Sequence, residues 1–127
     1  MNEPTKRALT ILLINDDEIQ LHWLRIIVEL GGFHVVRAQS VDEALTSLNQ
    51  NAPDLIMMDY WIGEVNGIEM CNLIRKRPDT YRTPIIMLCV GNKQPILQQA
   101  IEAGINTVLW MPFDPKEIIS TIESLIS

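Results

Sequence analysis

The sequence has little of several features that would point to particular classes of protein. It has only two cysteines, Cys71 and Cys89, at a spacing that suits neither a disulfide framework nor a metal-binding motif. It has no apolar run near the ~20 residues that a membrane helix needs, and residues 1–10 lack the apolar core of a signal peptide. Basic residues are outnumbered by acidic ones, 10 to 16. These absences argue against a disulfide-rich secreted protein, a membrane protein and a nucleic-acid-binding protein, and favour a reducing, cytoplasmic setting.

What the sequence does contain is a regular alternation of two kinds of segment. Short apolar runs of strand length alternate with stretches whose apolar residues recur at helical spacing. The predicted strands cover residues 9–15, 34–38, 55–58, 84–90 and 107–110, and the predicted helices cover 19–30, 41–50, 68–77, 95–103 and 115–126, with a loop at 60–66. At 127 residues we expect a single domain over 1–127, with its core over about 8–127 and a loose N-terminal leader over 1–7.

The predicted strands are apolar along their whole length rather than at alternate positions. Strands of this kind belong to parallel sheets that are covered on both faces. Alternation of strands and helices with right-handed crossovers then gives a doubly wound α/β fold, a five-stranded parallel sheet between two layers of helices. Ligands of such folds bind at the carboxyl ends of the strands, so the residues there are the first candidates for function.

Acidic residues follow two of these strands. Asp16, Asp17 and Glu18 follow the first strand, and Asp59 ends the third, after the apolar run LIMM. If the two strands are neighbours, Asp16, Asp17 and Asp59 converge, and like charges in a poorly solvated site repel strongly. A hard cation such as Mg²⁺ would relieve this repulsion. In the alternative interpretation, Asp17 and Glu18 are solvated residues that favour the start of a helix.

Four blocks of the sequence, taken in order, resemble the receiver domain of bacterial response regulators. The blocks are the acidic residues 16–18, PDLIMMDYWIGEVNGIE at 53–69, PIIMLCV at 84–90 and AGINTVLWMPF at 103–113. The resemblance runs from about Leu9 to the C-terminus. It implies the flavodoxin-like (CheY-like) α/β fold, a three-layer sandwich of five strands and five helices.

The resemblance also implies a role for each acidic residue. Asp59 matches the aspartate that accepts a phosphoryl group from a sensor histidine kinase or a phosphotransfer protein. Asp16 and Asp17 match the acidic pair that holds Mg²⁺ together with Asp59, and the backbone carbonyl of Trp61 would complete the protein ligands. The chain would then be a signalling domain of a two-component phosphorelay and not an enzyme, with at most slow self-dephosphorylation.

Four positions depart from the family pattern. Cys89 stands where a threonine or serine ends the fourth strand, and Met111 stands where a lysine precedes proline. Val108 replaces an aromatic residue that moves on activation, and Gly63 replaces a proline. We therefore expect an atypical receiver that binds Mg²⁺, is phosphorylated inefficiently and switches weakly. Lys93 could replace the absent lysine, although a solvated loop position is the simpler interpretation.

The predicted partner surface lies on the fifth strand. Val108 and Trp110 lie there, between helices 95–103 and 115–126, and Trp is a good interface anchor. By resemblance, this face binds a downstream effector, an output domain or a second copy in a homodimer. No contact with nucleic acid or membrane is expected of this domain. Whether the chain is a stand-alone receiver or part of a longer regulator stays open.

Other functions share this architecture. A dehalogenase-like phosphatase would need a second aspartate at the position of Trp61, and a flavodoxin-like FMN binder would need a phosphate-binding loop in place of the acidic residues 16–18. The stronger alternative is a pseudo-receiver that acts as a phosphorylation-independent protein-interaction module. In that case, Asp59→Asn would leave the in vivo phenotype unchanged.

Overall fold

The computed structural model describes residues 8–91 and 94–126, of which 94 and 95 are described by their backbone alone. The predicted leader at 1–7 and Lys93 lie outside the described residues. No helix within the described ranges is long and apolar enough to span a bilayer. The elements are, in order, β1 (Thr10–Ile14), α1 (Glu18–Leu30), β2 (His34–Ala38), α2 (Val41–Gln50), β3 (Leu55–Asp59), β4 (Trp61–Ile62), β5 (Val65–Asn66), α3 (Gly67–Arg75), β6 (Ile85–Cys89), α4 (Gln94–Ala103), β7 (Thr107–Trp110) and α5 (Pro115–Ile126).

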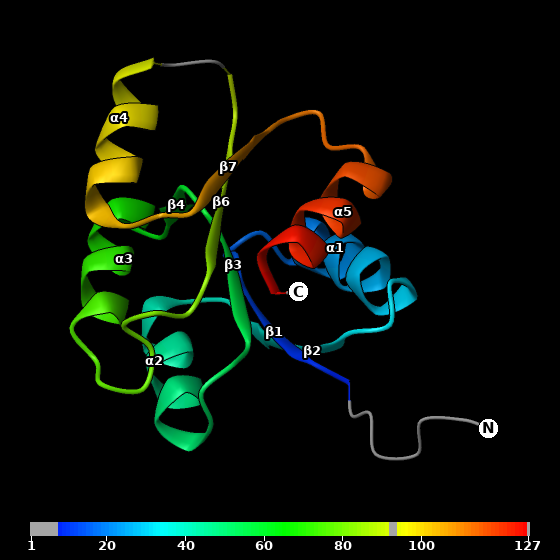
Figure 1. The fold of residues 1–127 in the computed structure, drawn as a ribbon, viewed down its shortest axis with the longest axis horizontal. Helices are drawn as coiled ribbons and strands as arrows, with labels where there is room; N and C mark the ends of the chain where they lie inside the picture. Colours follow the sequence, from blue (N-terminus) through cyan, green and yellow to red (C-terminus); the bar gives the residue numbers. More distant parts are fainter. Residues whose placement is uncertain (1–7, 92–93, 127) are drawn as a thin grey trace.

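Five of the strands form one parallel sheet in the order β2-β1-β3-β6-β7. Helices α1 and α5 cover one face of this sheet, and α2, α3 and α4 cover the other (Figure 1). The chain moves from β1 to β2 on one side and then to β3 on the other side, so the strand order reverses beside β1. The predicted doubly wound three-layer fold is confirmed, and its ligand position lies where β1 and β3 end.

The strands bury side chains on both faces, which explains why they are apolar throughout. In β3, Ile56 and Met58 pack into the core beneath α2, α3 and α4, whereas Leu55 and Met57 pack into the core beneath α1 and α5. Each of these four side chains is at most 1% exposed. Burial of one such side chain contributes about 1.5–3 kcal/mol. The strand is therefore held from both sides, and Asp59 stands at its end.

Two of the predicted boundaries were wrong. The segment predicted as a loop at 60–66 contains an antiparallel hairpin, β4–β5, which turns at Gly63 and Glu64. Gly63 has φ +63°, which only glycine adopts freely and which suits the first position of a two-residue hairpin turn. The helix predicted over 68–77 ends at Arg75, because Pro78 disfavours helical backbone at the residue before it.

Arg75 is a structural residue rather than a solvated charge at a helix end. Its guanidinium donates hydrogen bonds to the carbonyl oxygens of Gly104 (2.8 Å), Thr83 (2.7 Å) and Thr80 (3.1 Å), and to the Asn106 side chain. These bonds tie the end of α3 to the segments that precede β6 and β7.

Candidate functional site

The acidic residues singled out in the sequence lie at the carboxyl edge of the sheet. β1 and β3 are neighbouring parallel strands, with Ile14 paired to Met58. Asp59 is the last residue of β3, and Asp16 and Asp17 lie between β1 and α1. The expected adjacency of the two strands is confirmed, and it brings all three carboxylates to the point where the strand order reverses.

The carboxyl group of Asp59 is half-buried and surrounded by negative charge. Burial raises its pKa above the ordinary value of 3.8, and the charges of Asp16 and Asp17 raise the pKa further. A hydrogen bond from the Tyr60 N–H to Asp59 Oδ1, at 3.0 Å, opposes this shift. The Asp59 carboxylate therefore lies in an environment that a cation would stabilise.

Asp17 caps helix α1. Its Oδ1 accepts hydrogen bonds from the backbone N–H groups of Ile19 (3.0 Å) and Gln20 (3.2 Å), which confirms the helix-cap interpretation. The loop before it is held by Asn15, which is 1% exposed and whose Oδ1 accepts a hydrogen bond from the Asp17 N–H at 2.9 Å. Sequence analysis gave Asn15 no role, although a polar residue between an apolar strand and an acidic pair was the available signal.

Asp16 joins the acidic loop to the β4–β5 hairpin. Its Oδ2 accepts a hydrogen bond from the Gly63 N–H at 2.9 Å. A proline, which the family pattern has at this position, has no N–H and cannot adopt φ +63°. Gly63, which the sequence marked only as a departure from the family pattern, therefore supplies a contact to the site.

The three carboxylates suit a hard cation by their chemistry, but they do not form a preassembled cage. No three His, Cys, Asp or Glu side chains in the described part of the chain lie close enough together to hold a metal ion. The metal ligand set of Asp16, Asp17 and Asp59 therefore stays a prediction. Asp16, Asp17 and Asp59 accept hydrogen bonds from different backbone N–H groups, which stabilises each charge locally.

The sequence matches the family model of the response regulator receiver domain over residues 11–123, which include all of these acidic residues. The chain belongs to this family. It is thus a receiver domain of the response regulators of two-component systems.

Relatives of this receiver occur as parts of longer regulators. The chain is 31% identical over 116 residues to the phosphate regulon transcriptional regulatory protein PhoB of Rhizobium meliloti, a match that covers 91% of this chain and 51% of the relative. The chain therefore spans about half the length of the curated relatives it matches.

Solved structures with this fold are also similar. The receiver domain of a signal transduction histidine kinase from Syntrophus aciditrophicus superposes with a TM-score of 0.85 at 25% identity, covering 94% of this chain and 90% of that one. Chemotaxis protein CheY4 of Vibrio cholerae superposes with a TM-score of 0.89 at 22% identity, covering 94% and 99%, and supports the fold alone.

In this receiver, Cys89 ends β6 on the strand next to that of Asp59. Its side chain is 3% exposed. Burial raises the pKa of the thiol to about 11, with a smaller contribution from the charge of Asp59. The thiol is therefore protonated at neutral pH and poorly suited to redox sensing.

Met111 follows β7 at the same edge of the sheet. It is half-exposed and lines a cavity of about 330 Å³ together with Asp17, Trp23 and Phe113. An apolar side chain thus stands beside the acidic loop at the position where the family pattern has a lysine. Met111 can offer Asp17 neither a charge nor a strong hydrogen bond.

Val108 and Trp110, the predicted partner surface, are half-buried on β7. Both pack against the core that lies beneath α2, α3 and α4. Trp110 pairs in register with Cys89, so the two side-chain positions are neighbours across β6 and β7. This packing gives the two residues a core role, and their contact with a partner stays a prediction.

Trp61 stands two residues after Asp59, at the start of β4. Its side chain is exposed and meets the ring of Tyr60 edge-on, with ring centroids 5.2 Å apart. An exposed indole beside the acidic site is suited to report binding there by fluorescence. The role of the Trp61 backbone carbonyl as a metal ligand stays a prediction.

Proposed function

We propose that Asp59 accepts a phosphoryl group from a sensor histidine kinase or a phosphotransfer protein, with Mg²⁺ held by Asp16, Asp17, Asp59 and the backbone carbonyl of Trp61. The observation that carries this proposal is the half-buried Asp59 at the end of a rigid strand, with the charges of Asp16 and Asp17 acting on it. A group with a perturbed pKa at the ligand position of the fold is a candidate for chemistry.

The proposed reaction is a single transfer at phosphorus. One carboxylate oxygen of Asp59 forms a bond to phosphorus as the P–N bond of a phosphohistidine breaks, and the imidazole leaving group takes a proton from solvent. Mg²⁺, when bound, would neutralise charge on the phosphoryl oxygens. The chain holds the nucleophile in place, because β3 is buried on both faces and the Tyr60 N–H binds one Asp59 oxygen.

Transfer is expected to be slow and the response to it weak. Cys89 is a poor donor to a phosphoryl oxygen, and Met111 has no charge to contribute. A downstream effector or an output domain would then detect a small change. In this proposal the domain is not an enzyme beyond slow self-dephosphorylation, and it works in the cytoplasm, where its unpaired thiols, Cys71 and Cys89, stay reduced.

The first test is phosphorylation by acetyl phosphate with and without Mg²⁺. We expect the intact mass to increase by one phosphoryl group only when Mg²⁺ is present, and we expect no increase in Asp59→Asn. Asp42→Asn is the matched control, because Asp42 is an exposed aspartate on α2 outside the site. It should be labelled like the wild type.

A Mg²⁺ titration of the same samples separates metal binding from phosphorylation. Trp61 fluorescence should respond to Mg²⁺, and the response should be lost in Trp61→Phe, which keeps Trp23 and Trp110. A Mg²⁺ response without labelling would contradict the phosphoacceptor role and favour the interaction-module alternative. No response to Mg²⁺ would overturn the metal site.

A further inference from the structure

Asn15 is a buried polar side chain directly after β1, one residue before the acidic loop. It is 1% exposed, and among the described residues only Thr80 is a polar residue buried to the same extent. Its backbone N–H donates to the carbonyl oxygen of Ala38 at 3.0 Å, which extends the contact between β1 and β2 by one residue. A buried amide needs hydrogen-bond partners for both its oxygen and its NH₂ group, so these partners indicate what the side chain does.

The side chains of Asn15 and Gln20 form a closed ring of hydrogen bonds with Asp17. Asn15 Oδ1 accepts a hydrogen bond from the Asp17 N–H at 2.9 Å, and Asn15 Nδ2 donates to Gln20 Oε1. The backbone N–H of Gln20 donates to Asp17 Oδ1 at 3.2 Å, which closes the ring. Because the Asp17 N–H can only donate, the orientation of the Asn15 amide is fixed, and Gln20 must offer its oxygen.

The ring differs from an ordinary helix cap, of which α3 is an example in the same chain. There Glu69 accepts a hydrogen bond from the N–H of the cap residue Asn66, and the Asn66 side chain accepts one from the Glu69 N–H. In α1, Gln20 occupies the same position relative to its cap residue but binds Asn15, which in turn binds the N–H of that residue. This longer arrangement fixes the residues on both sides of Asp16.

Asp16 is therefore held at its backbone and at its side chain. The ring holds the residues before and after it, and its Oδ2 accepts the hydrogen bond from the Gly63 N–H at 2.9 Å. Neither Asp16 nor Asp17 forms an ion pair with another described residue. Neutral donors, rather than a cation, thus keep the acidic loop in its conformation.

We propose that Gln20 is a positioning residue for the Mg²⁺ site, acting through Asn15 on the backbone around Asp16. This inference depends on the proposed role of Asp16 and Asp17 as ligands. A loop whose backbone is already ordered loses less conformational entropy when it binds a cation, since only side-chain torsions remain to change. The ring then raises the affinity for Mg²⁺, while the transfer of a phosphoryl group to Asp59 does not depend on it.

Gln20→Met tests this role, because it nearly preserves the shape of the side chain and removes the acceptor. The cavity that Gln20 lines is otherwise largely apolar, with Trp23 and Phe113 in its walls, so methionine should be accommodated. We expect the Mg²⁺ dissociation constant, from titration followed by fluorescence, to rise about threefold to tenfold. Labelling by acetyl phosphate at saturating Mg²⁺ should stay within about twofold of the wild type, which separates positioning from chemistry.

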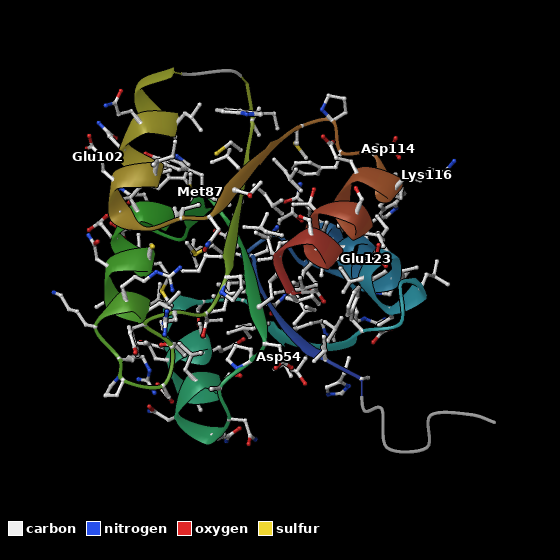
Figure 2. All side chains as sticks on the ribbon, viewed as in Figure 1. Asp54, Met87, Glu102, Asp114, Lys116 and Glu123 are labelled. Atoms are coloured by element: carbon white, nitrogen blue, oxygen red, sulfur yellow. The ribbon has the colours of Figure 1, made fainter. Side chains whose placement is uncertain are left out.

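Gln98→Met is the matched control. Gln98 is a helical glutamine whose side chain donates to Glu102, and Glu102 lies on α4, remote from α1 (Figure 2). This variant should bind Mg²⁺ like the wild type. Circular dichroism confirms that each variant is folded.

Amide hydrogen exchange of the metal-free chain tests the ring without Mg²⁺. The Asp17 N–H should exchange faster in Gln20→Met, and slow exchange should return in Gln20→Glu, which keeps a side-chain oxygen for Asn15 Nδ2. Unchanged exchange in Gln20→Met, or no recovery in Gln20→Glu, would overturn the proposal.

The titration distinguishes failure of this inference from failure of the proposed function. A wild type that binds Mg²⁺ no better than Gln20→Met, or a labelling rate at saturating Mg²⁺ that falls as much as the affinity, would overturn the role of Gln20 alone. A wild type that shows no response to Mg²⁺ would overturn the metal site and this role together.

Discussion

At the scale of single residues, the folded chain holds an unfavourable charge at Asp59. Burial raises the pKa of its carboxyl group, and the charges of Asp16 and Asp17 act in the same direction. The ionised form at neutral pH therefore costs stability, whereas the neutral form does not. A carboxylate that costs stability does not support the fold, so its presence indicates a chemical role for Asp59.

Asp59→Asn removes this charge and nearly preserves the shape of the side chain. At neutral pH we expect the variant to be more stable than the wild type by about 1 kcal/mol or less, because solvent screens the half-exposed site. Below pH 3.8 the Asp59 carboxyl is neutral in the folded and unfolded chains, and its cost appears as pH rises through the raised folded pKa. The advantage of the variant should therefore shrink as pH falls toward 3.8.

Urea unfolding of both proteins at a series of pH values measures this difference. Asp42→Asn on the exposed surface of α2 serves as the reference for a charge removed away from the site. A wild type that is more stable than Asp59→Asn at neutral pH would contradict the unfavourable environment inferred for this carboxylate.

At the scale of elements, the β4–β5 hairpin is coupled to the acidic loop through one hydrogen bond. The donor is the Gly63 N–H and the acceptor is Asp16 Oδ2, at 2.9 Å. The hairpin turns at Gly63 with φ +63°, so the same residue supplies both the turn and the contact. The hairpin therefore helps to orient Asp16 toward the carboxyl edge of the sheet.

Two substitutions at Gly63 separate its roles. Gly63→Ala keeps the N–H donor and should cost about 1 kcal/mol for the positive φ. Gly63→Pro cannot adopt this φ and also removes the donor to Asp16, so we expect a loss of about 2 kcal/mol or more. Gly32→Ala is the matched control, because Gly32 has φ +96° in open space beyond the far end of α1. Its substitution reports backbone strain alone.

Chemical denaturation of these three variants supplies the comparison. If Gly63→Pro were as stable as the wild type, the hairpin would be able to change its conformation freely. In that case the hydrogen bond from Gly63 to Asp16 would contribute nothing to the stability of the fold.

At the scale of the whole molecule, we expect weak conformational coupling between the acidic site and the rest of the sheet. Cys89 is buried at the end of β6 and pairs in register with Trp110 of β7, while Met111 stands half-exposed beyond it. A ligand shifts a conformational equilibrium only through contacts that differ between the two states. Neither Cys89 nor Met111 offers a strong contact to a phosphoryl group.

Cys89→Thr combined with Met111→Lys should strengthen the conformational response. With Mg²⁺ and beryllofluoride as a phosphoryl mimic, we expect the change in amide hydrogen exchange of β6 and β7 to be about twofold or more larger than in the wild type. The introduced hydroxyl and ammonium groups would both contact the mimic. Cys71→Thr is the matched control, because Cys71 is an equally buried cysteine on α3. A wild type that already responds as strongly as the double variant would contradict weak switching.

The sequence by itself determined the five strands of the parallel sheet and the five helices along the chain, but not the β4–β5 hairpin, and it determined the candidate acids. These features depend on patterns within a few residues: apolar runs of strand length, helical spacing, and charged residues that follow an apolar strand. Asp16, Asp17 and Asp59 could be chosen from the sequence because an ionised group directly after a buried strand is energetically costly, which indicates a functional role. Only the adjacency of β1 and β3 had to be assumed, and the fold class supplied it.

The tertiary structure alone decided which groups contact one another across the chain. Asp16 and Gly63 are 47 positions apart, and Arg75 bonds to Gly104 across 29, so no local pattern indicates either contact. Packing also decided which side of α1 is covered. Leu24 lies against the sheet and Trp23 next to it lies outside, although both are apolar. The physical reason is that the propensity for helix or strand depends on residues close in the sequence. The burial of a side chain depends instead on which other element the fold packs against that face of its helix or strand.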